Sequence, residues 1–440
     1  MPHIIVSGAI ANKPANGGEA WVRLSWLIGF WQIGCDVHFV EQIDAAACCD
    51  EQGNRVPPLE SRNVSHFRHV LEQAGWSERA FLVDEQGEIL VGPNSNLGPN
   101  RSSGGNGNNA SEPIQIPLTP ALSKRERGKK ADSNTGDLNA ILDRADLLVN
   151  ISGHLHCERI FSRLRHKAYI DIDPGFTQFW HAEGNAGARL AGHDFFFTIG
   201  ENIGTAACPI PTTGIPWQAV RQPVVIDDWQ FTEKETERTD AMEQTRPRFT
   251  TIASWRGAFG AVEFGGRRYG LKCHEFRKVL ELPRRVPNCD FEIALDIHPA
   301  DERDRNALLE HGWKIVDPRA VASDVITFRD YVQQSSAEFS VAQGIYAETQ
   351  SGWFSDRTVR YLAAGKPALV QETGFGRHLP TGEGLLSFRN LDEATAGAAE
   401  ISADYPRHSQ AARRIAAEFF DARVVLPRFL SACGVGGGGG

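Results

Sequence analysis

The stretch FSDRTVRYLAAGKPALV, residues 354–370, decides the fold of this 440-residue chain. Ser355 is a residue type that caps helices, and Asp356 suits the partial positive charge of a first helical turn. Gly365 allows the left-handed backbone that ends many helices, and the proline two residues later prevents continuation. The order predicts a short helix from about 356 to 364 that leads directly into a parallel strand.

The start of this helix is a candidate anion site. Its first backbone N–H groups lack partners within the helix, and they carry a partial positive charge that suits a diphosphate. Arg357 adds a forked cation and Thr358 a hydroxyl donor. The alternative is that Arg357 makes a surface ion pair and that Ser355 is only a cap.

The N-terminal residues predict a βαβ unit. Residues 4–6 are apolar, Gly17 and Gly18 interrupt the chain, and apolar residues at helical spacing follow up to Trp31. A second apolar run at 37–40 completes the unit, whose two strands should be parallel with a right-handed crossover.

The same alternation continues through both halves of the chain. Further predicted strands are 147–149, 169–172 and 195–199 in the first half, and 250–253, 291–295, 338–341 and 368–370 in the second. Alternating strands and helices predict two parallel sheets, hence two Rossmann-like α/β domains. Ligands of such sheets bind outside the carboxyl ends of the strands, where the first half has Asn150 to His154, Asp173 to Gly175 and Gly200 to Asn202.

Composition shifts divide the chain. A Pro-rich stretch followed by charges marks a linker, and an Asn-, Gly-, Ser- and Lys-rich stretch has no period that could bury a face, so we expect it to be disordered. The predicted segments are an N-terminal acceptor domain (1–222) with the disordered insert (93–136), a linker (223–248), a donor-binding domain (249–405), terminal helices (406–433) that cross back to the first domain, and a Gly-rich tail (434–440).

Composition and charge narrow the function class. Hydrophobic residues make up 41% and charged residues 23%, as in a globular protein. The net charge of −9 offers no basic footprint, so we expect no nucleic-acid partner. The eight cysteines contain no C-x-x-C pair, which fits a reducing compartment. Without a leader pattern or a run that spans a bilayer, we expect a cytoplasmic protein with at most peripheral membrane contact.

Residues 354–370 resemble the group 1 family of glycosyltransferases, in particular the branch related to spore-coat maturation proteins. That branch carries a helix of the form F-x-x-R-x-x-E-Y-L-A-x-G-K-P-V after its donor loop. The resemblance implies a GT-B architecture: two Rossmann-like domains facing a cleft, with the nucleotide held mainly by the second domain and a C-terminal helix that returns to the first. It also implies that helix ends and cations, rather than an obligatory metal ion, neutralise the diphosphate.

The chain departs from the family at two positions. Many members have a pair of Glu in this region, and here Gly352 and Arg360 stand in their places. Glu372 or Glu383 could supply the missing carboxylate contact to the donor ribose, although both also fit solvated loop residues. The predicted donor site consists of Gly17, Gly18, His298, Ser355, Arg357, Thr358, Glu372, Thr373, Gly382 and Glu383.

The pair Gly17 and Gly18 resembles the loop that approaches the donor phosphates or the acceptor in this fold. The alternative interpretation of the pair is a simple turn. No G-x-G-x-x-G pattern accompanies it, so we expect no dinucleotide cofactor. The only co-substrate expected is a nucleotide diphosphate sugar.

The candidate residues for acid–base catalysis directly follow predicted strands. His154 and Asp173 are the predicted catalytic residues, with His298 in a similar place in the second half. An inverting enzyme needs such a base, whereas a retaining enzyme of this fold needs none. The alternative for each residue is a hydrogen-bonded loop group. His154, His156 and Cys157 lack convergent further ligands, so no metal site is predicted.

The predicted function is transfer of a sugar from a nucleotide diphosphate sugar to an acceptor. Two alternatives share the architecture: a sugar-nucleotide epimerase or hydrolase, and a binding protein without catalysis, for which Arg360 is the one hint. Phe176, Phe179 and Trp180 follow Asp173 and could stack on a sugar, but core packing is the preferred interpretation.

Overall fold

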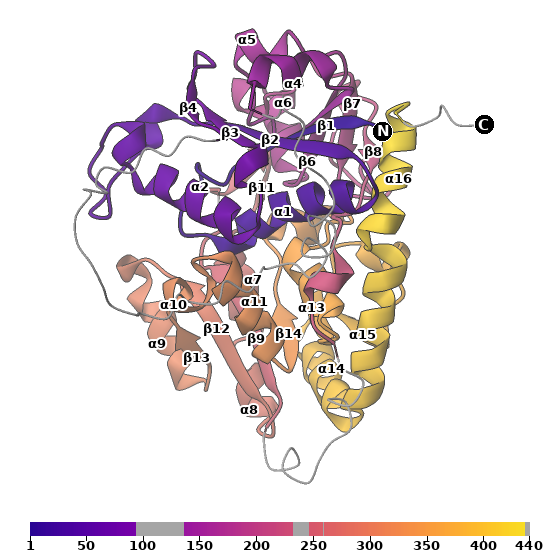
Figure 1. Cartoon of the computed structure of the whole chain (residues 1–440). Coiled ribbons are helices and arrows are strands. Elements are labelled where there is room, and N and C mark those ends of the chain that lie inside the picture. The colour runs from indigo at the N-terminus through magenta and orange to yellow at the C-terminus, as the bar shows by residue number, and fades with distance from the viewer. Residues whose placement is uncertain (94–135, 232–245, 258, 436–440) are drawn as a thin grey trace.

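The computed structural model describes residues 1–93, 136–231, 246–257 and 259–435 and shows two α/β units stacked one on the other (Figure 1). Each unit is built on one open sheet flanked by helices. Most of the predicted insert, much of the predicted linker and the end of the Gly-rich tail lie outside the described residues.

The first unit contains an eight-stranded sheet. Its strands are β1 (His3–Ser7), β2 (Asp36–Gln42), β3 (Ala80–Val83), β4 (Ile89–Val91), β5 (Leu147–Ile151), β6 (Lys167–Asp171), β7 (Phe195–Thr198) and β8 (Gln218–Ala219). Their order is β4-β3-β2-β1-β5-β6-β7-β8, and only β3 and β4 pair antiparallel. Because β1, β5 and β6 are neighbours, the loops that follow them meet at one carboxyl edge.

Alternating residues of β1 fill both faces of this sheet. Ile4 and Val6 belong to the core shared with α1 (Gly17–Gln32) and α2 (Arg62–Gln73), and Ile5 belongs to the core under α4 (Leu138–Arg144) and α5 (Glu158–Phe161). A fully buried Ile contributes about 1.5–3 kcal/mol, so both faces hold the unit together.

The second unit contains a six-stranded sheet in which every neighbouring pair is parallel. Its strands are β9 (Arg248–Ser254), β12 (Asp290–Asp296), β13 (Lys314–Val316), β14 (Ala337–Ser340), β15 (Ala368–Gln371) and β16 (Leu385–Phe388), in the order β13-β12-β9-β14-β15-β16. A separate hairpin is formed by β10 (Val262–Phe264) and β11 (Arg267–Tyr269).

The helices of the second unit connect these strands. They are α7 (Lys272–Lys278), α8 (Leu282–Arg285), α9 (Glu302–Glu310), α10 (Pro318–Ala322), α11 (Val325–Gln334), α12 (Gly344–Thr349), α13 (Asp356–Ala363) and α14 (Leu391–Ala403). Since α13 joins two parallel strands, β14 and β15, its first residue lies at the carboxyl edge of the sheet.

Two C-terminal helices connect the units. In Figure 1, α15 (Tyr405–Phe419) runs beside the second unit and α16 (Ala422–Ala432) beside the first. The ring of Phe429 on α16 lies 5.3 Å from Trp26 and 4.7 Å from Phe197 of the first unit. The predicted return of the C-terminus to the first domain is confirmed. The segment is two helices, because Asp421 begins a new one by capping Arg423.

The two-domain α/β prediction is confirmed, with differences in detail. The predicted strands lie in β1, β2, β5, β6, β7, β9, β12, β14 and β15, whereas the short strands β3, β4, β8, β10, β11, β13 and β16 were not predicted. Gly17 and Gly18 are not in a loop: they are the first residues of α1, and Asn16 caps that helix by accepting from Glu19.

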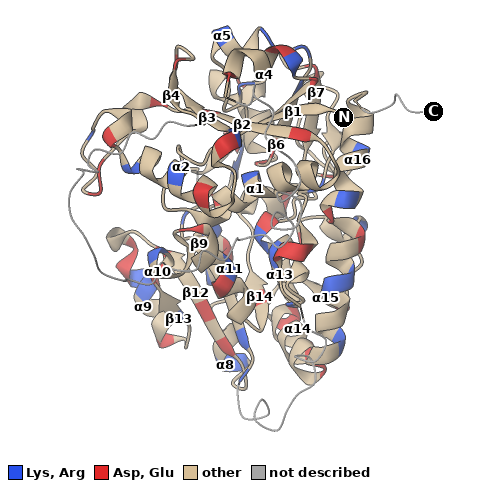
Figure 2. Cartoon of the chain, viewed as in Figure 1, with Lys and Arg blue, Asp and Glu red and all other residues tan. Residues whose placement is uncertain are grey.

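Charged residues of both signs are interspersed along α9, α13 and α15 (Figure 2). Within the described ranges, no helix combines the length and the apolar character needed to cross a membrane.

Candidate active site

The start of α13 has unpaired backbone donors. The N–H groups of Asp356, Arg357 and Thr358 donate to no described residue. The sequence predicts that the Ser355 hydroxyl caps them, but its side chain accepts no such hydrogen bond. A cavity of about 10 Å³ borders this turn and is lined in part by Ser355, Thr358 and Trp353. That volume is room for roughly one water molecule. The predicted donor-rich helix start is therefore present, beside a very small space.

Arg357 does not point at a ligand. Its guanidinium donates to Glu338 Oε1 at 2.7 Å, to the Ile252 carbonyl at 2.7 Å and to the Ser340 hydroxyl at 2.6 Å. The Glu338 side chain is fully buried and the Arg357 side chain is 13% exposed. Both earlier interpretations therefore change: Arg357 is neither a free phosphate clamp nor part of a surface ion pair, but a structural link between α13, β14 and β9.

Lys272 is a cation that the sequence interpretation missed. It is the first residue of α7 and has no ion-pair partner among the described residues. Burial, and then the positive charge of Arg357, lower the pKa of Lys272 to about 7. The charges of Glu338 and Asp356 also act on it, so its ammonium lies near the start of α13. A lysine at the start of a helix after Gly270 is the only sequence signal that could have indicated it.

His154 and Asp173 lie on the facing edge of the first unit, after β5 and β6. Burial, followed by the charges of Arg23, Arg189 and Lys13, lowers the pKa of His154 well below its ordinary value. Burial and these positive charges both favour the neutral form of the His154 imidazole.

Asp173 contacts the second unit directly. Its Oδ1 lies 3.3 Å from the hydroxyl of Tyr346 on α12. Burial, with the negative charges of Glu19 and Asp171, raises the pKa of Asp173 to about 7. A carboxyl group with this pKa changes protonation state near neutral pH, as a general base does.

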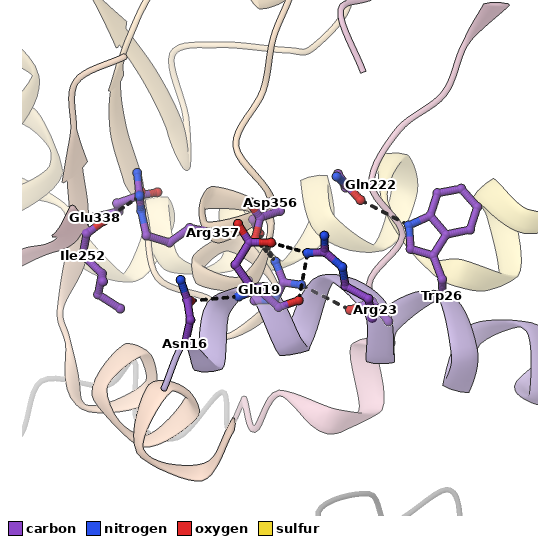
Figure 3. A network of polar contacts seen from close by, with 11 residues as sticks. Asn16, Glu19, Arg23, Trp26, Gln222, Ile252, Glu338, Asp356 and Arg357 are labelled. Carbon is purple, nitrogen blue, oxygen red and sulfur yellow. Dashed lines mark hydrogen bonds and ion pairs between the residues drawn. The ribbon is translucent and has the colours of Figure 1, made fainter. Parts of the chain in front are cut away.

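A polar network joins α1 to α13 (Figure 3). Arg23 pairs with Glu19 on α1, while Arg360 on α13 donates to Asp356 Oδ2 at 2.7 Å and to the Ser25 hydroxyl at 3.4 Å. Burial raises the pKa of Glu19, but the nearby cations outweigh it, so the net pKa is lowered. Arg360, which stands where many members of the group 1 family have a Glu, thus serves the junction between the units.

Gly17 serves the same junction. A Cβ added to Gly17 would lie 2.0 Å from the backbone oxygen of Asp324, and one added to Gly18 would lie 3.1 Å from the Phe328 ring. Trp21 Nε1 also donates to the Val325 carbonyl at 2.8 Å. The two glycines therefore allow α1 to pack closely on the segment between α10 and α11.

Glu372 and Thr373 shape a loop at the carboxyl edge. Glu372 Oε1 accepts from the backbone N–H of Gly374 at 2.7 Å, and the Thr373 hydroxyl donates to the Trp353 carbonyl. Both residues are buried. Asn202 of the first unit, which follows β7 as predicted for an edge residue, donates to the carbonyls of Gln350 and Gly374.

Three predicted donor residues lie elsewhere. Gly382 and Glu383 precede β16 and so lie at the amino edge of the sheet, where Glu383 is 3.9 Å from Arg407. Sequence order alone could not show that the loop crosses to that edge. His298 follows β12, is exposed, and accepts from the backbone of Ala300. No described contact joins it to the start of α13.

Of the aromatic residues after Asp173, Phe176 and Phe179 are core residues and Trp180 is partly buried against them. Phe179 stacks on Phe264 at 4.5 Å, and Phe176 lies 6.1 Å from Tyr346, within an apolar cluster that both units share. Among the described residues, no group of three or more His, Cys, Asp and Glu side chains could hold a metal ion.

Known structures share this architecture. An alpha-glucosyltransferase in complex with UDP and a 13-mer DNA superposes with a TM-score of 0.52 at 10% identity, covering 98% of this chain and 99% of that one. Anabaena HepE in complex with UDP and glucose gives 0.52 at 10% identity, with 99% and 100% covered. Sucrose-phosphate synthase from Thermosynechococcus elongatus gives 0.51 at 10% identity, with 98% and 100% covered. The chain has the GT-B fold of these glycosyltransferases, as predicted.

No protein-family model matches the sequence, and no curated protein matches it. One expectation is overturned. We expected no nucleic-acid partner because of the net charge, and this expectation is wrong, because a protein of this fold is seen in complex with DNA. Net charge sums over the whole surface, whereas binding depends on local charge.

Proposed function

We propose that this chain is a glycosyltransferase that moves a sugar from a nucleotide diphosphate sugar to an acceptor hydroxyl. We further place it in the group 1 family, in the branch related to spore-coat maturation proteins, on the residues quoted for 354–370. The observation that carries the proposal is the start of α13, at the edge that faces the first unit. Its first three N–H groups and the nearby Lys272 have no partner among the described residues.

These donors suit a diphosphate leaving group. Backbone N–H groups at a helix start and a lysine ammonium stabilise negative charge that grows as the sugar–phosphate bond breaks. The cavity beside Ser355 and Thr358 is smaller than a phosphate, so we expect lining side chains such as Trp353 to move when the donor binds. The alpha-glucosyltransferase and HepE structures described above both hold UDP, which supports this class of donor.

The acceptor would lie against the first unit. There Asp173, with a pKa near neutrality, is better suited than His154 to take the proton from an acceptor hydroxyl. Arg357, Glu372 and Thr373 have positioning roles in this proposal, since their polar atoms are already bonded to protein groups.

The test measures thermal unfolding with UDP, GDP and TDP, followed by diphosphate release from the matching nucleotide sugar. We expect one diphosphate to stabilise the protein and Lys272→Met to weaken its binding about 10- to 100-fold, the worth of a hydrogen bond to a charged group. Lys278→Met is the matched control, because Lys278 is on the same helix, 61% exposed and paired with Glu275. Unchanged unfolding with all three diphosphates would refute the proposal.

A further inference from the structure

Two cations at the carboxyl edge of the first unit have no partner in the part of the chain that the structure describes. Lys13 lies in the loop after β1 and Arg189 lies over the loop after β5, where its Cβ would be 2.8 Å from a Cβ added to Gly153. Both side chains belong to exposed residues, and neither has an ion pair or a side-chain hydrogen bond within the described part of the chain. Exposed cations are common, so a binding role for these two requires that the fold hold them in place.

The loop that holds Lys13 is fixed in place. The buried carboxylate of Glu41 accepts the backbone N–H groups of Ile10 at 2.9 Å, Ala11 at 3.0 Å and Asn12 at 2.9 Å. Glu41 lies on β2, so three consecutive peptides before Lys13 are anchored to the sheet. The backbone that precedes Lys13 is therefore ordered by the fold rather than free to sample many positions.

Arg189 is fixed in a different way. Its backbone is left-handed, with φ of 52°, a conformation that a non-glycine residue seldom adopts without a structural reason. The preceding carbonyl, that of Ala188, accepts the hydroxyl of buried Tyr169 at 3.0 Å. Gly153 has no side chain, and this allows Arg189 to lie directly on the loop that carries His154.

A third cation, Arg23, is buried in the same region of the carboxyl edge. Arg23 is 1% exposed, and its Nε has no hydrogen-bond partner among the described residues. A Cβ added to Gly8, at the end of β1, would lie 2.8 Å from that Nε. Because β1 and β5 are paired, the loop that holds Lys13 and the loop under Arg189 are neighbours, and the charges of Arg23, Arg189 and Lys13 all act on His154. Only Arg23 is paired, with Glu19.

We propose that Lys13 and Arg189, beside His154, bind a phosphate monoester carried by the acceptor. Two unpaired cations match the charge of one such dianion, and a neutral imidazole can donate one further hydrogen bond. Asp173 follows the neighbouring strand β6, so a hydroxyl of the same acceptor could reach it. The assignment of this anion to the acceptor rests on the proposed function, which places the donor diphosphate in the second unit.

The test uses the full chain with its donor site filled by saturating UDP. Thermal unfolding is measured with glucose 6-phosphate and inorganic phosphate, and with glucose as the neutral control. We expect further stabilisation by the two phosphates only. Lys13→Gln and Arg189→Gln should each weaken apparent phosphate affinity about 10- to 100-fold, and Arg189→Lys should restore part of it. Arg165→Gln, an exposed arginine before the amino end of β6, should change nothing.

The outcomes separate the two proposals. If UDP does not stabilise the unmodified protein against thermal unfolding, this would count against the proposed donor site and not against the phosphate subsite. A normal UDP effect with equal responses to glucose and glucose 6-phosphate, or variants that keep full phosphate affinity, would overturn the subsite. A 13-mer duplex DNA that stabilises the protein through Lys13 and Arg189, when glucose 6-phosphate does not, would overturn it in favour of a polynucleotide.

Discussion

The guanidinium of Arg357 meets the carboxylate of Glu338 at 2.7 Å in a place where Glu338 is fully buried. This pair ties the first turn of α13 to β14. Burial raises the pKa of Glu338, while Arg357 acts in the opposite direction, so the carboxylate depends on its arginine to stay charged. The position of the α13 start is thus set from inside the second unit.

Removing Arg357 should therefore destabilise the protein. We expect Arg357→Ala to lower the free energy of unfolding by about 3–5 kcal/mol, because it leaves a buried charge without a partner. Arg277→Ala is the control, since Arg277 is 48% exposed and pairs with Asp304 on the surface, where such pairs contribute about 0–1 kcal/mol. Chemical denaturation of both variants measures the difference, and equal losses would contradict the buried role.

The sequence could indicate the helix at Asp356 but not the direction of the Arg357 side chain. Helix capping and termination depend on neighbouring residues, so the prediction of 356–364 agrees closely with α13, Asp356–Ala363. The partners of Arg357 come from β9 and β14, far away along the chain. Similarly, strands of two or three residues such as β8 and β13 are too short to show a period.

Gly17 should not tolerate a side chain. Gly17→Ala would place a methyl group 2.0 Å from the backbone oxygen of Asp324, which cannot rotate away, so α1 must shift from α11. We expect a loss of about 1–3 kcal/mol in the free energy of unfolding. At Gly18 the nearest atom is on the Phe328 ring at 3.1 Å, so Gly18→Ala needs only a small shift of that ring and should cost less than Gly17→Ala. Denaturant titration of the two variants tests this, and a tolerated Gly17→Ala would argue against the close packing.

Asp173 should make stability depend on pH. Its pKa rises from 3.8 to about 7 on folding, so its contribution is full below pH about 4 and is lost as pH rises through about 7. We expect Asp173→Asn, which resembles the protonated form, to gain stability relative to the unmodified protein across this window. Denaturation at pH 4.5 to 8 measures the difference between the two proteins. A constant difference would show that the carboxyl group does not titrate there.

Tyr346→Phe provides a second measurement on the same carboxyl group. The Tyr346 hydroxyl lowers the pKa of Asp173, against burial and the charges of Glu19 and Asp171, and the charge of Lys13 lowers it further. Removing the hydroxyl should therefore raise the pKa of Asp173 and move the loss of stability to higher pH. The ring of Tyr346 still stacks on Trp353 at 4.4 Å, so packing is preserved. A shift toward lower pH would contradict the assigned contact.

The sequence predicts where several candidate residues lie in the fold, while their role in a donor or acceptor site stays a prediction. His154, Asp173 and Ser355 do lie at the two facing carboxyl edges, because strand ends can be located from apolar runs. Lys272 was missed because its significance depends on packing near Arg357 rather than on a motif. Glu383 was included because a loop position alone does not show at which edge of the sheet it lies.

Once a donor and an acceptor are identified, kinetic measurements should distinguish the roles of the two catalytic candidates, Asp173 and His154. If Asp173 takes the proton from the acceptor hydroxyl, kcat should rise with pH to a plateau above about 7, as the carboxylate form fills. Asp173→Asn should lower kcat by about 10²- to 10⁴-fold and remove that rise. His154→Gln should keep the rise and mainly increase the KM for the acceptor, while His156→Gln, an exposed neighbour, serves as the control. A pH profile that survives in Asp173→Asn but disappears in His154→Gln would reverse these roles.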